Sequence, residues 1–328
     1  MKKFKSLFVE KKSGEKFILS VKKNFFDKIS KDEIVIKVSY SSVNYKDYLI
    51  CNGNPGLVRK FPHVPGIDAA GKVYISNTKK FKFGDKVMII AKPMGIETMG
   101  GFTEYLKVPS KWVEKIPKNL TEKESMVFGT AGFTAAKIVL NIKNKSKKKN
   151  PILISGASGG VGLFSIILLS KYGFNLTAIT KKNKSKFLKK IGISNIISYD
   201  QFVRKSNLPM LKTKYSNMID NTGGATISEG IKQIENKGKV FLIGNSVSNF
   251  SEINVLPFIL REIKLIGINA ENTNYVIRKK IWKMLLSISK DKRINLIYKQ
   301  YNLRQVKSVI KKFRSNTKFG RYLVKINK

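Results

Sequence analysis

Residues 152–162 read Ile-Leu-Ile-Ser-Gly-Ala-Ser-Gly-Gly-Val-Gly and lead directly into the apolar run from Leu163 to Leu169. This order is typical of a buried strand, a tight turn and a helix. The glycines at 156, 159 and 162 let the backbone turn sharply, approach a ligand closely and pack the helix against the strand. Because the N-terminus of a helix presents unpaired N–H groups and the positive end of its dipole, the stretch predicts a site for phosphate groups.

The surrounding sequence narrows this prediction to a dinucleotide. The glycines are three residues apart, which departs from Gly-x-Gly-x-x-Gly, and the Gly-Lys-Ser/Thr ending of a P-loop is absent. A site for NAD places an acidic residue about 20 positions further on, but residues 177–186 contain no acid. Thr180 can donate a hydrogen bond there, and Lys181 and Lys182 can supply charge to a 2′-phosphate. NADPH is therefore the expected cofactor, with a ligand-free glycine bend in another α/β fold as the alternative.

The sequence on either side of the turn alternates between short apolar runs and helical patterns. This alternation predicts a parallel, doubly wound sheet of the Rossmann type. The basic stretch 143–150 is typical of an exposed loop. The expected strands are 152–155, 175–180, one near Ile196, 217–220, 240–244 and 263–267, and the expected helices are 122–140, 161–172 and 184–191.

The N-terminal third is instead rich in alternating β patterns, at 34–38, 70–75 and 86–91, broken by Gly and Pro. A further strand is expected at 322–326. At 328 residues the chain is longer than one hydrophobic core supports. We expect a β-barrel-type catalytic domain at 1–121, completed by 295–328, and a dinucleotide-binding domain at 122–294.

Composition limits the classes of site that the chain can build. With one cysteine and one histidine, Cys51 and His63, it has neither a disulfide framework nor a zinc site of several Cys and His ligands, so no metal is expected. Both residues are expected to be packed rather than reactive. Residues 1–12 lack the apolar stretch of a signal peptide, which predicts a cytoplasmic protein. The uncharged segment 151–170 divides into strand, turn and helix, so no membrane partner is expected.

The formal net charge of +43 raises a function of another class, RNA binding on a dinucleotide-binding fold. The excess is mostly Lys and is spread along the whole chain, whereas phosphate recognition favours clustered Arg. We therefore expect no specific nucleic-acid partner. The charge should instead raise the encounter rate with anions such as NADPH and CoA esters.

Four further motifs extend the pattern to most of the chain. They are Ser-Ser-Val-Asn-Tyr-Lys-Asp at 41–47, Phe-Pro-His-Val-Pro-Gly-Ile-Asp at 61–68, Gly-Thr-Ala-Gly-Phe-Thr-Ala at 129–135 and Pro-Phe-Ile-Leu-Arg at 257–261. Together with the glycine turn they resemble the medium-chain dehydrogenase/reductase superfamily, in its zinc-free quinone-oxidoreductase-like branch, and within that branch the bacterial acrylyl-CoA reductase group. The resemblance implies a Rossmann domain plus a GroES-like catalytic domain.

The resemblance also implies an activity. In the zinc alcohol dehydrogenases of this superfamily, a Cys and a His-Glu pair stand where this chain has Asn44 and Ile67-Asp68. The implied reaction is NADPH-dependent reduction of the C=C bond of a short 2-enoyl-CoA such as acrylyl-CoA, with hydrogen-bond donors stabilising charge on the thioester oxygen. The alternative is an NADPH:quinone oxidoreductase; the motifs at 129–135 and 257–261 favour the thioester.

By similarity, Asn44 polarises the substrate carbonyl, Tyr45 contacts the cofactor and Asp47 orients Asn44. A structural alternative is that Asn44 caps a helix starting near Asp47, and both roles can coexist. The resemblance further implies a homodimer formed through the edge of the cofactor-domain sheet. The implied cofactor ligands are Ser158, Gly159, Gly160 and Val161 for the pyrophosphate, Thr180, Lys181, Lys182 and Tyr199 for the 2′-phosphoadenosine end, and Asn245, Ile259 and Ala270 for the nicotinamide side.

Overall fold

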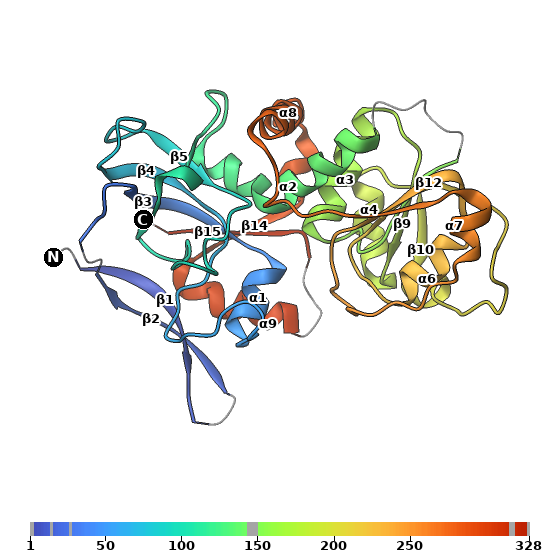
Figure 1. The fold of residues 1–328 in the computed structure, drawn as a ribbon, viewed down its shortest axis with the longest axis horizontal. Coiled ribbons are helices and arrows are strands. Elements are labelled where there is room, and N and C mark those ends of the chain that lie inside the picture. The colour runs from blue at the N-terminus through green and yellow to red at the C-terminus, as the bar shows by residue number, and fades with distance from the viewer. Residues whose placement is uncertain (1–2, 14–15, 26–27, 143–149, 315–318, 327–328) are drawn as a thin grey trace. The chain divides into compact units, whose positions relative to one another are not determined.

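The computed structural model describes residues 3–13, 16–25, 28–142, 150–314 and 319–326, without the side chains of Lys182 and Arg314. The chain divides into two compact units (Figure 1). Unit 1 comprises Met1–Phe133, Leu285–Ser289 and Ile297–Lys328, and unit 2 comprises Thr134–Met284 and Lys290–Leu296. Unit 1 thus includes residues 122–133, and the domain boundaries predicted at 121 and 295 remain a proposal.

Unit 1 is built mainly on antiparallel strands, with β14 paired parallel to β15 as the exception. Its larger sheet has the order β14-β15-β3-β4-β5-β7, with β6 paired to β3, while β1 and β2 form a separate hairpin. An apolar core between these strands includes Leu7, Val38, Phe102 and Val324, and smaller apolar clusters form around Val35 and Ile50. The strands are β1 (Phe4–Lys11), β2 (Phe17–Asn24), β3 (Glu33–Val43), β4 (Ala69–Ser76), β5 (Lys86–Ile89), β6 (Tyr105–Pro109), β7 (Glu114–Lys115), β14 (Tyr298–Asn302) and β15 (Arg321–Lys325), and the helices are α1 (Tyr45–Cys51), α9 (Val306–Arg314) and the 3-10 turns η1 (Ser110–Trp112) and η4 (Leu303–Gln305).

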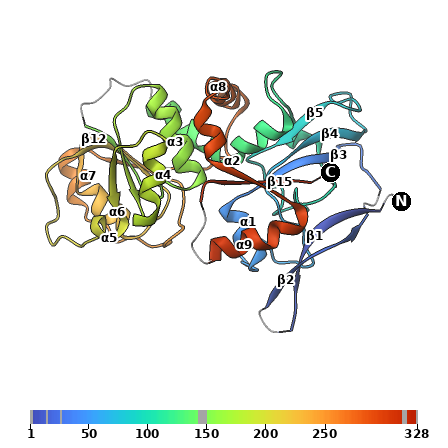
Figure 2. The same ribbon diagram turned by 180° about the vertical axis from the view of Figure 1, so that it is seen from behind.

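Unit 2 is a parallel sheet with the order β10-β9-β8-β11-β12-β13. Counted along the chain this is the order 3-2-1-4-5-6 of a Rossmann fold, as the alternation of strands and helices predicted. The elements are β8 (Ile152–Ile154), α3 (Gly160–Lys171), β9 (Leu176–Thr180), η2 (Lys182–Lys184), α4 (Ser185–Lys190), β10 (Asn195–Ser198), α5 (Tyr199–Phe202), β11 (Tyr215–Asp220), α6 (Ala225–Ile231), β12 (Ile234–Leu242), α7 (Leu256–Arg261), β13 (Lys264–Gly267) and η3 (Lys292–Leu296). Figure 2 shows α3 and α4 in front of this sheet.

Two helices, α2 (Glu122–Ile142) and α8 (Tyr275–Leu286), contribute residues to both units. The helix expected at 122–140 forms as α2, but it is broken at Gly129, whose φ of 50° and ψ of −159° are not helical. By length and composition α2 would suffice to cross a membrane, but most of it is buried within the fold, as in a core helix. The loop expected at 143–150 lies, apart from Asn150, outside the described residues.

Smaller differences from the expected elements have local causes. The strand expected at 86–91 ends at Ile89, because Ala91 adopts a positive φ of 53° that a strand does not tolerate. The hairpin of β1 and β2 and the helices α8 and α9 had no counterpart in the sequence prediction. In α9, Val306, Val309, Ile310 and Phe313 recur at helical spacing, so the sequence did carry a signal for this helix.

Candidate functional site

The segment that joins β3 to α1 carries the first group of predicted site residues. Asn44 is the N-cap residue of α1, which begins at Tyr45 rather than near Asp47. The Asp47 carboxylate accepts the Asn44 backbone N–H at 2.7 Å and the Ile67 N–H at 2.9 Å. Asp47 is completely buried. It therefore fixes both the start of α1 and the loop that precedes Asp68.

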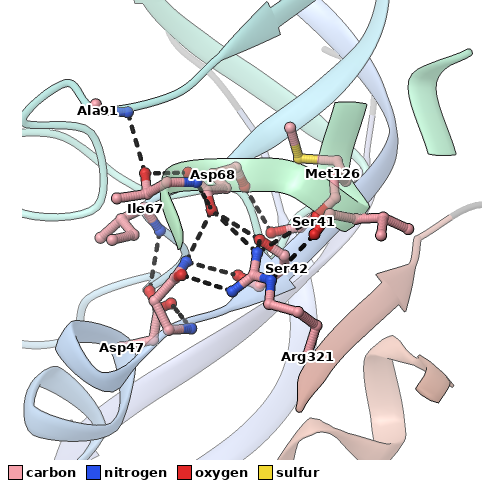
Figure 3. Close-up of polar contacts among 11 residues, drawn as sticks. Ser41, Ser42, Asp47, Ile67, Asp68, Ala91, Met126 and Arg321 are labelled. Carbon is pink, nitrogen blue, oxygen red and sulfur yellow. Dashed lines mark hydrogen bonds and ion pairs between the residues drawn. The ribbon is translucent and has the colours of Figure 1, made fainter. Parts of the chain in front are cut away.

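Asp68 lies at the centre of a polar network in unit 1 (Figure 3). Its Oδ2 atom accepts hydrogen bonds from Asn44 Nδ2 at 2.8 Å and from Ser42 Oγ at 2.7 Å. Thr130 adds a bond from its hydroxyl to Oδ1 at 2.6 Å and one from its backbone N–H to Oδ2 at 3.0 Å. Asp68 is fully buried, so these donors replace the water that a carboxylate would otherwise bind.

Arg321, the first residue of β15, completes this network from the C-terminal end of the chain. Its Nη1 donates to Asn44 Oδ1 at 2.9 Å, its Nη2 donates to Ser42 Oγ at 2.7 Å, and its Nε donates to the Val127 carbonyl at 3.1 Å. The distance from Nη2 to Asp68 Oδ2 is 3.8 Å. We call these six residues, Ser42, Asn44, Asp47, Asp68, Thr130 and Arg321, the Arg321 cluster.

The break in α2 is a consequence of this cluster. A Cβ on Gly129 would lie 2.4 Å from Arg321 Nη2 and 2.6 Å from Asp68 Oδ2. Only glycine leaves room for the ion pair at this point, and its positive φ breaks the helix. The motif at 129–135 therefore serves the polar network, with Thr130 as a direct ligand of Asp68.

Burial shifts the protonation equilibria of the cluster. Loss of water raises the pKa of Asp47 to about 7; the backbone N–H donor of Asn44 opposes this shift, and the nearby Asp68 adds to it. Burial also lowers the pKa of Arg321, while Asp68 and Asp47 raise it. The carboxylates of Asp47 and Asp68 are thus both stabilised by the buried guanidinium of Arg321. Removal of any one of these three groups would leave a buried charge without its partner.

The geometry limits what Asn44 and Tyr45 can do chemically. Asn44 Nδ2 donates to Asp68 and, at a longer 3.3 Å, to the Ser42 carbonyl, so a substrate oxygen would have to replace the second acceptor. The ring of Tyr45 stacks on Tyr48 with centroids 5.7 Å apart. Burial, followed by the influence of Tyr48, raises the Tyr45 pKa, so its hydroxyl keeps its proton at neutral pH and can donate to an anionic oxygen.

Sequence reasoning missed the roles of Asp68, Thr130 and Arg321. Asp68 was noted only as the residue that replaces a metal ligand. Arg321 begins the apolar run 321–326, and a buried arginine must have a partner, but the sequence does not say which one. Arg321 lies far along the chain from Asn44 and meets it only because β15 pairs antiparallel with β3.

The glycine turn, residues 156–162, forms the second group of site residues in unit 2. It leads from β8 into α3, which begins at Gly160 and has no acidic residue in its first turn. A Cβ on Gly162 would lie 2.7 Å from Ala157 Cα and from the Gly156 carbonyl oxygen, so glycine is needed for the helix to pack. A Cβ on Gly159 would approach only the Gly156 oxygen, at 3.3 Å. An open space in front of unpaired helix N–H groups fits a pyrophosphate.

The other predicted cofactor residues follow the carboxyl ends of the parallel strands. Thr180, the last residue of β9, donates to Ser158 Oγ at 3.4 Å, and its neighbour in β10, Ser198, directly precedes Tyr199. Asn245 comes soon after β12 and Ala270 after β13. The structure thus brings Ser158 and Thr180 together at the edge where such folds bind nucleotides. Ile259 instead lies on α7 with 66% of its surface exposed.

Thr180 is followed by Lys181 and by the lysines of η2, the turn that precedes α4. The side chain of Lys182 lies outside the described residues. Lys184 is half-buried, and burial together with the charge of Lys181 lowers its pKa. A bound anion would relieve this unfavourable concentration of positive charge, as a 2′-phosphate would.

Asp220, at the end of β11, is a further residue that sequence reasoning missed. It is fully buried and accepts hydrogen bonds from Ser155 Oγ at 2.5 Å, from Thr222 Oγ1 at 2.9 Å and from the Gly223 N–H at 2.7 Å. The Asn221 amide donates to the Ser155 carbonyl at 2.8 Å. These bonds tie the end of β11 to the residue before the glycine turn.

Three other residues named in the sequence analysis make contacts that stabilise the fold. His63 is buried and bonds to the Gly95 carbonyl at 2.8 Å, and Cys51 is buried in the core of unit 1. Arg261 donates to the backbone carbonyls of Lys232 and Leu211, at 2.8 and 2.7 Å, so it stabilises loops of unit 2. This contact explains the motif at 257–261 without a substrate. Among the described residues no group of three His, Cys, Asp or Glu side chains could hold a metal ion.

Comparison with known proteins shows the protein family of both units. Residues 30–118 match the family model of the alcohol dehydrogenase GroES-like domain, and residues 160–287 match that of the zinc-binding dehydrogenases. The chain is 32% identical to the putative quinone oxidoreductase YhfP of Bacillus subtilis, over 98% of this chain and 99% of that protein. It is 31% identical to the acrylyl-CoA reductase AcuI of Ruegeria pomeroyi, over 86% of this chain and 87% of that protein.

Two solved structures are similar to this protein over nearly the whole chain. The YhdH oxidoreductase of Salmonella enterica in complex with NADP has a TM-score of 0.92 and 28% identity, and the match covers 98% of this chain and 100% of that one. The YhfP protein of Bacillus subtilis with NAD bound has a TM-score of 0.91 and 32% identity, with 99% and 100% coverage. These two neighbours differ in the cofactor that they hold.

Proposed function

Because this chain belongs to the zinc-free, quinone-oxidoreductase-like branch of the medium-chain dehydrogenase/reductase superfamily, we propose that it is an NADPH-dependent reductase of the C=C bond of short 2-enoyl-CoA thioesters, with acrylyl-CoA converted to propionyl-CoA. The observation that carries the proposal is the pairing of an intact glycine turn with the buried, fully hydrogen-bonded Arg321 cluster.

The glycine turn is the proposed cofactor site. Ser158, Gly159, Gly160 and Val161 would bind the pyrophosphate at the N-terminus of α3. The 2′-phosphate would lie near Thr180, Lys181, Lys182 and Tyr199, with Asn245 and Ala270 on the nicotinamide side. NADPH is favoured over NADH for two reasons. Residues 177–186 contain no acid that would repel a 2′-phosphate, and the half-buried Lys184 lies near the positive charge of Lys181, which an anion would neutralise. When bound, the reduced nicotinamide supplies a hydride.

The Arg321 cluster would hold the groups that act on the substrate. As the β-carbon of the enoyl thioester is reduced, negative charge develops on the carbonyl oxygen, and hydrogen-bond donors fixed in advance stabilise that charge. The Arg321 guanidinium binds the Asn44 amide oxygen and so polarises its N–H donors. Asn44 would exchange its weak bond to Ser42 for one to the substrate oxygen, and Tyr45 would donate a hydrogen bond from its hydroxyl to the same oxygen. The α-carbon would then take up a proton from water, and the bond from the Asn44 backbone N–H to Asp47 holds Asn44 in place.

A quinone reductase is the second candidate, since the similarity to a putative quinone oxidoreductase covers nearly the whole chain. A steady-state assay of NADPH and NADH consumption with acrylyl-CoA, crotonyl-CoA and a small quinone separates the two. We expect the highest kcat/KM with acrylyl-CoA and NADPH. A higher value with the quinone would overturn the thioester assignment, and failure of the protein to bind NADPH in calorimetry would overturn the whole proposal.

The role of Asn44 has its own test. Asn44→Ala should lower kcat about 100-fold, the usual effect of losing an oxyanion donor. The control Asn77→Ala removes an exposed amide whose bonds go to the Ile29 and Ser30 carbonyls, and it should leave kcat unchanged. NADPH affinity, which a folded variant retains, distinguishes a catalytic loss from unfolding.

A homodimer formed through unit 2 is the proposed assembly. β13 is the last strand of its sheet, and the adjoining helix α7 exposes Ile259 and Leu260, whose exposed fractions are 66% and 61%. An open sheet edge next to apolar side chains is typical of a subunit interface. Leu260→Asp should therefore shift the protein from dimer to monomer in analytical ultracentrifugation. A location in the cytoplasm and an acyl-CoA as the small-molecule partner belong to the same proposal.

A further inference from the structure

A groove in unit 1 lies outside both groups of site residues. It has a volume of about 420 Å³, within the range of roughly 300–1,000 Å³ found for small-ligand sites. The β1–β2 hairpin forms one side, and the turn η4 with the start of α9 forms the other; these elements lie side by side in Figures 1 and 2. The lining residues are Lys5, Leu7, Leu19, Val21, Lys22, Lys23, Arg304 and Lys307.

The apolar part of the lining is aliphatic. Leu7 is buried in the core of unit 1, and Leu19 and Val21 pack against the same core from β2 while remaining partly exposed. No aromatic residue lines the groove. Nucleotide bases bind chiefly by stacking on aromatic side chains, so this lining suits an alkyl chain better than a base.

The charged part of the lining is entirely positive. It contains five cations and no carboxylate. Lys22 is paired with Glu10 at 2.7 Å. Within the part of the chain that the structure describes, Lys5, Lys23, Arg304 and Lys307 have no ion-pair partner. Four cations around one groove, none with an ion-pair partner among the described residues, attract an anion and gain from binding it.

We propose that this groove binds a single-chain alkyl phosphate, a ligand beyond the reaction proposed above. The alkyl chain would lie along Leu19 and Val21, and the phosphate would bind Arg304, Lys307 and Lys23. A phosphate fits better than a carboxylate because it offers more charge and more acceptors to several cations at once. A bilayer surface fits less well, because the apolar side chains line a groove instead of protruding from the surface.

The test is calorimetric titration of the full chain with decyl phosphate below its micelle concentration. We expect one site per chain, with decanol and inorganic phosphate each binding at least about tenfold more weakly, since each lacks half of the recognised chemistry. Decanoate should bind with intermediate affinity. Equal affinity for inorganic phosphate and decyl phosphate would overturn the proposal, as would binding only to vesicles that contain anionic lipid.

Variants locate the site. Arg304→Glu combined with Lys307→Glu should weaken decyl phosphate binding about 100-fold, since two charge-assisted contacts are lost. The matched control, Lys212→Glu combined with Lys214→Glu, makes the same charge change on exposed residues of unit 2 and should leave the affinity unchanged. Val21→Thr, which keeps the shape and strand preference of valine, should weaken binding severalfold. Unchanged binding in the first double variant, or equal loss in its control, would overturn the proposal.

Discussion

The two groups of site residues are built in opposite ways. The glycine turn is one continuous stretch, it has no side chain larger than valine, and its proposed binding groups are backbone N–H groups at the start of α3. The Arg321 cluster joins residues from β3, α1, α2, β15 and the loop before β4, and it is held together by buried side chains of opposite charge. The glycine turn therefore depends on the space that missing side chains leave, and the Arg321 cluster depends on each buried charge having its partner.

This difference sets how each site should respond to mutation. In the glycine turn, an added methyl group occupies ligand space and disturbs little else. In the Arg321 cluster, a removed group leaves a buried charge without a partner, and the cost falls on the fold itself.

Replacing Arg321 by methionine should have the largest effect. The substitution leaves the buried Asp47 and Asp68 without a cation, which should lower the free energy of unfolding by about 3–5 kcal/mol. Arg321→Lys should lie between this variant and the wild type, because it keeps the charge but loses the fork of donors. Urea denaturation measures the effect. The control is Lys325→Met in the same strand, where the side chain is exposed; a similar loss there would mean that strand β15, and not the cluster, is sensitive.

The pH dependence of stability should identify Asp47. Its pKa in the folded protein is about 7, raised from an ordinary value of 3.8. Between about pH 4 and 7 the folded state therefore binds a proton that the unfolded state has released, and the free energy of unfolding should fall as pH rises through this window, by on the order of a few kcal/mol.

Asp47→Asn should remove this part of the slope, as measured by denaturation at a series of pH values. Asp85→Asn is the control, because Asp85 is partly exposed and its pKa is lowered by the hydrogen bond from Lys115, so it titrates below the window. A slope in the Asp47 variant equal to that of the wild type would show that another buried group takes up the proton.

Gly159→Ala should affect binding more than stability. Its added Cβ meets only the Gly156 oxygen at 3.3 Å, but it enters the space proposed for the pyrophosphate. We expect the Kd for NADPH to rise about tenfold, the loss of one charge-assisted hydrogen bond, with a Tm close to that of the wild type. Gly267→Ala, at a position with open space around it, is the control and should bind NADPH normally. A large drop in Tm for Gly159→Ala would contradict this prediction, because it would show that the glycine turn, like the Arg321 cluster, is needed for stability.

Lys184→Met should have the smallest effect, confined to one cofactor. Removing this half-buried cation should raise the Kd for NADPH about fivefold and leave the Kd for NADH unchanged, because only NADPH carries the 2′-phosphate. Lys190→Met, at the other end of α4, is the control. An equal change for both cofactors would argue against a 2′-phosphate contact. The experiment also bears on the two structural neighbours, one of which holds NADP and the other NAD.

The sequence alone determined the features that depend on neighbours along the chain. The parallel sheet, its Rossmann type and the strand-turn-helix at 152–171 follow from periodicity and from three glycines, since local backbone geometry decides them. Asn44 and Asp47 could be singled out for the same reason, because a helix N-terminus is a local structure.

Only the tertiary structure decided which residues meet Asn44. The pairing of β15 with β3 brings in Arg321, the loop before β4 supplies Asp68, and the break at Gly129 makes room for both. The same holds for the groove beneath the β1–β2 hairpin, whose lysines look like any others in a lysine-rich sequence. A buried charge needs a partner, but its identity depends on long-range strand pairing, to which the residues next to it in sequence give no clue.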